Sequence, residues 1–121
     1  MQTPVQLTFR SMPHSDALAA HLRERAEKLE HLFDRIVSCH VVIELSGHDH
    51  RHGDRCRFGV HVGLPGREVL VTHSAAEDHD HPDAFAAADR AFDDVERRVA
   101  HWVKRQREHR HDPLPVDRSS T

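Results

Sequence analysis

The segment His81–Arg110, HPDAFAAADRAFDDVERRVAHWVKRQREHR, carries the longest helical pattern in the chain. Its apolar residues recur at alternating spacings of three and four, which places them on one side of a helix and predicts that this side is buried. They are Phe85, Ala88, Phe92, Val95, Val99 and Trp102 with Val103. Pro82 is a favoured first helical residue and marks the predicted start. The rest of the chain must therefore supply an apolar surface for this helix to cover.

Charged residues divide the same stretch into two halves. Between Glu77 and Glu96, eight acids stand against the single base Arg90, whereas residues 97–110 hold six bases against the single acid Glu108. The side opposite the apolar stripe carries Arg90, Arg97, His101 and Lys104, with Arg98 and Arg105 beside them. We therefore predict a helix with a core-facing side and a basic outer side.

The preceding residues alternate between apolar and polar in four short segments, which predicts half-buried strands. These segments are residues 3–10, 36–45, 56–64 and 67–73. Between the first two, Ser15 is placed to cap a helix that begins at Asp16. Its predicted buried stripe is Leu18, Leu22, Ala26, Leu29 and Phe33. The order β-α-β-β-β-α predicts an α/β fold of the α+β two-layer type, a four-stranded mixed sheet with both helices packed on one face.

The length of 121 residues indicates one domain, which we place at residues 1–107. Residues 108–121 contain two prolines and little to bury, so we expect a disordered C-terminal tail. No apolar run is long enough for a membrane span, and the N-terminus does not resemble a secretory signal. Cys39 and Cys56 fall at expected core positions without a C-x-x-C spacing, so we expect free thiols and a cytoplasmic protein.

Fourteen histidines make the net charge depend on pH. The formal charge is −3 with histidine neutral. At the reference pKa of about 6.5, roughly a quarter of exposed histidines are charged at pH 7, which nearly cancels that deficit. The position of the charged residues along the chain therefore indicates more about binding partners than the net charge does.

Three motifs, in this order, resemble those of bacterial ribosome hibernation factors, the hibernation-promoting factor and ribosome-associated inhibitor A family. Phe9–Leu18, FRSMPHSDAL, is similar to the turn from the first strand into the first helix of that family. Lys28–Ile36, KLEHLFDRI, matches the end of that helix, and Asp83–Asp89, DAFAAAD, matches the start of the last helix. The resemblance covers about residues 3–107.

The resemblance implies a protein without enzymatic activity or cofactor that binds the small ribosomal subunit and its 16S-type rRNA. Family members occupy the channel used by mRNA and by tRNAs at the A and P sites, and so inhibit translation on idle ribosomes. Long members add a C-terminal dimerising domain; because the sequence stops at Thr121, we expect a short, single-domain member that is monomeric off the ribosome. We expect neither DNA nor a membrane as a partner. Inactivation of single ribosomes and promotion of ribosome pairing both stay open.

Basic side chains at matching helix positions are the predicted rRNA-binding residues. Arginine and lysine grip structured RNA through its phosphates without reading sequence. The residues are Arg23, Arg25, Lys28, Arg90, Arg97, Arg98, His101, Lys104 and Arg105. The chain departs from the family in two respects, because acids are mixed into the last helix and one loop is rich in histidine. A solvated face with internal Glu–Arg and Asp–Arg pairs, such as Asp94–Arg98, is the other interpretation of this stripe.

The histidine-rich loop is the basis of the alternative function, a histidine-rich metal-binding module on the same scaffold. His48, His50 and His52 alternate with Asp49 and Arg51, a pattern suited to borderline metals such as zinc or nickel. A second hypothesis for the histidines is that mild acidification makes the protein more cationic and strengthens RNA binding. We find no nucleophile motif or phosphate-binding loop that indicates an enzyme.

Overall fold

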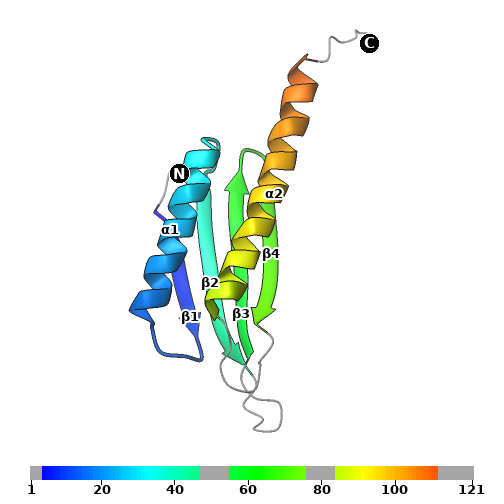
Figure 1. Ribbon diagram of the computed structural model, residues 1–121. Helices are drawn as coiled ribbons and strands as arrows, with labels where there is room; N and C mark the ends of the chain where they lie inside the picture. Colours follow the sequence, from blue (N-terminus) through cyan, green and yellow to red (C-terminus); the bar gives the residue numbers. More distant parts are fainter. Residues whose placement is uncertain (1–3, 47–54, 76–83, 112–121) are drawn as a thin grey trace.

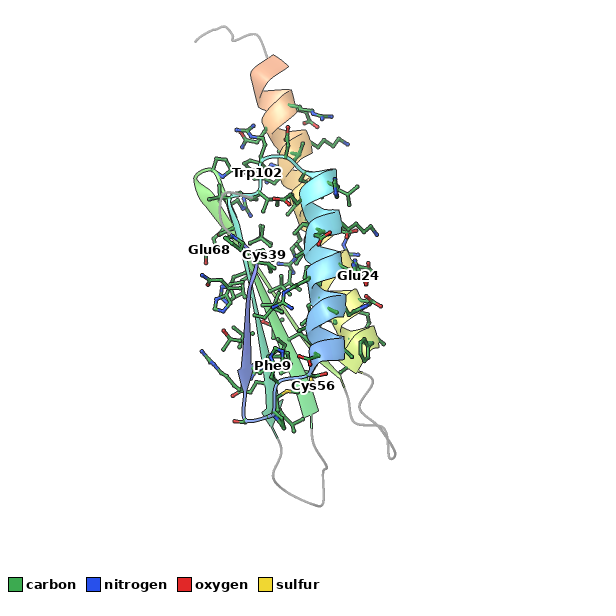
Figure 2. The ribbon with its side chains drawn as sticks, turned by 90° about the vertical axis from the view of Figure 1, so that its left-hand side faces the viewer. Phe9, Glu24, Cys39, Cys56, Glu68 and Trp102 are labelled. Carbon is green, nitrogen blue, oxygen red and sulfur yellow. The ribbon has the colours of Figure 1, made fainter. Side chains whose placement is uncertain are left out.

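Six elements form a two-layer structure in the computed structural model, which describes residues 4–46, 55–75 and 84–111. They are β1 (Gln6–Arg10), α1 (Asp16–Leu32), β2 (Ser38–Ser46), β3 (Arg55–Leu64), β4 (Arg67–Ala75) and α2 (Ala84–His111). The sheet order is β1-β2-β3-β4; β1 and β2 are parallel, and the other pairs are antiparallel. Both helices cover one face of the sheet (Figures 1 and 2). The predicted fold is confirmed.

The core lies between this face of the sheet and the helices. Alternate residues of the strands point to it, because successive side chains of a strand lie on opposite faces. The strand register places Val41 opposite Val60, and Val60 in turn opposite Val71. All three side chains are buried, as are Ile43 and Phe58. The period-two pattern of the sequence thus corresponds to one continuous apolar surface.

Local signals at the ends of α1 agree with the sequence. The Ser15 hydroxyl oxygen accepts a hydrogen bond from the backbone N–H of Leu18 at 3.3 Å, which caps the first turn. At the other end Phe33 is extended, and its N–H donates to the carbonyl oxygen of Leu29 at 3.0 Å. The predicted stripe is buried at Leu18, Leu22, Ala26 and Leu29, whereas Phe33 is only half-buried at the helix end.

The apolar stripe of α2 is confirmed from Ala88 to Trp102, but the prediction for Phe85 is wrong. Phe85 is 44% exposed. It lies in the first turn and packs edge-on against the ring of His21 on α1, with the ring centroids 5.3 Å apart. Ala87 and Ala91 are buried instead, and both have small side chains.

The last turns of α2 extend past the end of the sheet (Figure 1). The helix continues to His111, so the first residues of the predicted tail are helical. Residues 112–121, and Pro82 as the predicted first helical residue, lie outside the described residues. None of the helices in the described part of the chain is long and apolar enough to cross a membrane.

Both cysteines are free and buried in the core, as predicted. Burial raises the pKa of the Cys39 thiol to about 12, because the apolar surroundings disfavour the thiolate. In a Cys56→Ser variant at pH 8, we therefore expect the remaining thiol to react with an aromatic disulfide reagent at least about a hundredfold more slowly in the native protein than in denaturant. Equal rates in the two conditions would show that Cys39 is accessible and reactive.

Candidate nucleic-acid interface

A network of ion pairs joins α1 to the first half of α2, and Arg25 is its centre. The two terminal nitrogens of Arg25 contact three carboxylates of α2. Nη1 lies 2.9 Å from Asp89 Oδ1, while Nη2 lies 2.8 Å from Asp93 Oδ1 and 3.1 Å from Glu96 Oε2. The Arg25 side chain is only 13% exposed, and its guanidinium lies 5.5 Å from the centre of the Phe92 ring. Arg25 thus holds the two helices together.

Two further pairs flank Arg25 along the contact between the two helices. We call this contact the seam; it consists of His21, Arg25 and Lys28 of α1 and Asp89, Asp93 and Glu96 of α2. His21 Nε2 lies 2.7 Å from Asp89 Oδ1, and Lys28 Nζ lies 3.8 Å from Glu96 Oε1. Burial by itself raises the pKa of Asp89, but hydrogen bonds and charge from His21 and Arg25 outweigh it and hold that pKa below its ordinary value. The seam is therefore charged on both sides at neutral pH.

The predicted RNA-binding residues of α1 and of the first half of α2 differ in whether an acidic side chain balances their charge. Arg25 is one of the predicted rRNA-binding residues, but the structure places it among three carboxylates of the first half of α2. Lys28 is partly balanced by Glu96. Arg23 and Arg90 are exposed and form no ion pair within the described residues. A cationic surface does not extend over the seam, because acids there outnumber bases.

Asp94 anchors the start of the basic half of α2. Its carboxylate pairs with Arg97, lies 3.5 Å from Arg98 Nε and lies 3.5 Å from His73 Nε2 on β4. Burial raises the pKa of Asp94, but the hydrogen bonds from Arg97 and His73 and the nearby guanidinium charges lower it below the ordinary value overall. The predicted Asp94–Arg98 contact is present, yet Arg97 and Arg98 remain 75% and 55% exposed. One carboxylate therefore balances only one of these two charges.

Beyond Arg98, the described basic side chains of α2 have no such partner. Within the described residues, His101, Lys104, Arg105 and Arg107 form no ion pair. Two basic residues from other elements join them. Arg35, which follows α1, lies 5.4 Å from the centre of the Trp102 ring, and Arg67 begins β4. We call this group the basic end; it consists of Arg35, Arg67, Arg97, Arg98, His101, Lys104, Arg105 and Arg107.

Two grooves divide the basic end, one on each side of α2. The first has a volume of about 450 Å³ and runs between α2 and the β3–β4 turn; its arginines are Arg67, Arg98 and Arg105, and His101 lies beside them. The second, of about 570 Å³, lies between α2 and the end of α1; its cationic residues are Arg35, Lys104 and Arg107. Among the described residues, the acids near these grooves are Asp34, Glu68, Asp94 and Glu108, fewer than the seven arginine and lysine residues of the basic end. The basic end thus keeps a net positive charge.

Trp102 lies under the basic end as a core residue, as predicted. It is 7% exposed and belongs to the main apolar cluster. Figure 2 places it where α2 leaves the sheet. A guanidinium within about 6 Å of an indole ring is attracted to its face, so the ring also helps to position Arg35. The sequence prediction did not include Arg35, Arg67 or Arg107, and only the fold brings the first two to α2.

The histidine-rich loop that suggested a metal site falls outside the part of the chain that the structure describes. His48, His50 and His52 lie outside the described residues, as do His79 and His81. Within the described ranges, no group of three or more histidine, cysteine or acidic side chains is arranged to hold a metal ion. Nothing in these ranges favours the metal-binding alternative.

Comparison with known proteins relates this arrangement to one family. Residues 5–107 match the family described as Sigma 54 modulation protein / S30EA ribosomal protein. Over 115 residues the chain is 29% identical to the ribosome hibernation promotion factor of Deinococcus radiodurans, a match that covers 91% of this chain and 56% of that protein. The chain therefore spans about half the length of this curated relative.

Two solved structures share the fold. A ribosomal subunit interface protein from Coxiella burnetii superposes with a TM-score of 0.66 at 15% identity, over 83% of this chain and 97% of that one. The N-terminal domain of Protein Y from Thermus thermophilus gives a TM-score of 0.63 at 27% identity, over 80% of this chain and 94% of that one. The first similarity concerns the fold alone.

Proposed function

This chain belongs to the Sigma 54 modulation protein / S30EA ribosomal protein family, and we propose that it is a ribosome hibernation factor. In this proposal it binds 16S-type rRNA of the small ribosomal subunit in the cytoplasm. It occupies the channel of mRNA and of the A- and P-site tRNAs, and so inhibits translation in starved or stressed cells. It acts by blocking the channel and not by catalysis. The name of the Deinococcus radiodurans relative, ribosome hibernation promotion factor, supports the biological role.

The basic end is the observation that carries this proposal. Structured RNA is recognised largely through its phosphates and 2′-hydroxyls, and a protein gains affinity for it by releasing counterions. Such a partner requires cations whose charge is not already balanced. Lys104, Arg105 and Arg107 form no ion pair with any described residue and so meet this requirement, whereas Arg25 does not. We therefore assign the RNA contact to the basic end rather than to the full length of both helices.

Sedimentation through sucrose gradients tests the proposal. Purified subunits are mixed with the protein at high magnesium, which keeps ribosomes associated, and at low magnesium, which separates them. We expect the protein to migrate with intact ribosomes in the first case and with small subunits in the second. Ribosomes loaded beforehand with mRNA and P-site tRNA should retain much less protein. Protein that stays at the top of the gradient, or follows only large subunits, would contradict the proposal.

A further inference from the structure

We propose that the groove between α2 and the β3–β4 turn binds the sugar–phosphate backbone of a single RNA strand. The proposal rests on the proposed function, since it says how the basic end engages its RNA. Arg98, His101 and Arg105 follow one another along α2 at spacings of three and four, so they share one side of the helix. Arg67 faces them from the turn across the groove. Cations therefore line both walls.

The dimensions of the groove favour a strand over an isolated phosphate. Arg105 lies seven positions after Arg98, which corresponds to about 10 Å along the helix axis. The groove continues along the edge of β4 into a second hollow of about 330 Å³, which shares Arg67, Arg98 and His101 and reaches Arg97. One phosphate cannot contact cations spread over this length, whereas successive phosphates of one strand can. The row of charges therefore fits a chain of anions.

The charges in the groove are available to a ligand. Within the described residues, Arg67, His101 and Arg105 form no ion pair, and Arg98 makes only contacts of 3.5 Å with Asp94 and with the carbonyl oxygen of Leu70. The acid nearest in sequence to Arg67 is Glu68. It is 74% exposed and lies 3.8 Å from His61, on the side of the sheet away from the helices (Figure 2). Glu68 lines the second hollow beside Arg67 but forms no ion pair with it among the described residues, so it offsets only part of the positive charge there.

The turn leaves room for the backbone of a nucleic acid. Gly66 has a φ of +73°, a conformation that side chains disfavour, and apart from its two chain neighbours no residue has an atom within 4 Å of the position where a Cβ would stand. Pro65 and Gly66 thus form a wall without long side chains, next to the guanidinium of Arg67. Arginine can donate two parallel hydrogen bonds to a phosphate, so this geometry suits close contact with the strand.

Trp102 provides a direct readout, because it lines the groove and the chain contains one tryptophan and no tyrosine. The full chain is titrated at low salt with a short single-stranded RNA of mixed sequence and, separately, with inorganic pyrophosphate. We expect the RNA to change the Trp102 emission in a saturable way and pyrophosphate to bind far more weakly. An Arg67→Gln variant should weaken RNA binding by about tenfold, the usual effect of losing a hydrogen bond to a charged group. Arg105→Gln should act in the same direction.

An Arg107→Gln variant removes the same charge from the other groove and is the matched comparison. Its effect should be no more than about threefold, because it leaves the strand contacts in place. If Arg67→Gln weakens RNA binding no more than Arg107→Gln, the groove proposal is wrong, even where the wild type still sediments with small subunits. If Arg67→Gln weakens RNA binding more than Arg107→Gln does, but the wild type does not sediment with small subunits, the groove proposal is supported and the proposed function is wrong. Pyrophosphate binding as tight as RNA binding would assign the groove to a small phosphate ligand and overturn the strand proposal.

Discussion

Replacing Arg25 with methionine is expected to lower the free energy of unfolding by about 2 to 3 kcal/mol at neutral pH. Methionine retains most of the apolar stem, so the loss comes mainly from the charge. Three α2 carboxylates that Arg25 now holds within 3.1 Å would face one another with only His21 and Lys28 nearby. Removing one partner of a buried pair costs 3 to 5 kcal/mol, and we reduce that figure because Asp89 and Asp93 are substantially exposed. Urea unfolding at pH 7 measures the difference.

The same substitution should change how stability depends on pH. The pKa of Asp89 is lowered in the folded protein, so the stability it contributes is present above its ordinary value of 3.8 and is lost as the pH falls through the lowered folded pKa. Without Arg25 the carboxylates repel one another, and their protonation relieves that repulsion. The deficit of Arg25→Met relative to the wild type should therefore shrink as the pH falls from 7 toward 3. A deficit that stays constant over this range would show that lost packing, not lost charge, is the cause.

Two variants complete this test. Arg23→Met changes a neighbouring arginine of α1 that is exposed and forms no ion pair within the described part of the chain, so its effect should stay within about 0.5 kcal/mol. Adding Asp93→Asn and Glu96→Gln to Arg25→Met should recover part of the lost stability, because it removes the repelling charges. Equal destabilisation by Arg23→Met and Arg25→Met would exclude the ion-pair network as the link between the helices.

The role of Arg25 could not be predicted from helical periodicity alone. The spacing of Arg25 from Leu22 and Leu29 places it beside the apolar stripe of its own helix, a position that can face either solvent or a neighbouring helix. A second pattern carried the missing information. His21, Arg25 and Lys28 are spaced four and three, and the acids of α2 at 89, 93 and 96 repeat that spacing with opposite charge. Since the two helices run side by side in the same direction, the stripes meet in register (Figure 1).

The position of Arg67 depends on topology, and this is why the sequence analysis did not include it. Arg67 directly follows Pro65 and Gly66 of the β3–β4 turn, and the sequence alone does not show which other element lies against this turn. Because α2 returns along the sheet antiparallel to β4, its second half reaches the β3–β4 turn. Strand and helix periodicity thus predicted the layers and the core, with Phe85 as the exception. Which charges are paired at the seam and which remain unpaired at the basic end could be found only from the three-dimensional arrangement.

Reversing the charge of the basic end is expected to abolish binding to the small ribosomal subunit. The variant carries four substitutions, Arg67→Glu, Lys104→Glu, Arg105→Glu and Arg107→Glu. Each replaces an attraction to phosphate with a repulsion, so we expect the affinity to fall by at least about a thousandfold at physiological salt. Arg97 and Arg98 are left unchanged, because glutamate there would stand beside Asp94 and disturb the helix itself. All four substituted side chains are exposed, so the melting temperature should change little.

A control variant separates the basic end from the overall charge. It reverses four other exposed arginines, at positions 10, 23, 57 and 90, and so changes the net charge by the same amount. If the basic end makes the contact, this control still sediments with small subunits, and its affinity falls only through long-range repulsion, which salt screens within about 10 Å. The dependence of affinity on salt gives an independent measure. For the control the slope of log K against log salt should match the wild type, whereas each lost phosphate contact reduces it by about 0.7 to 0.9. If both variants lose binding to the same extent, the protein associates with the ribosome through its total charge, and no particular end of the molecule is the interface.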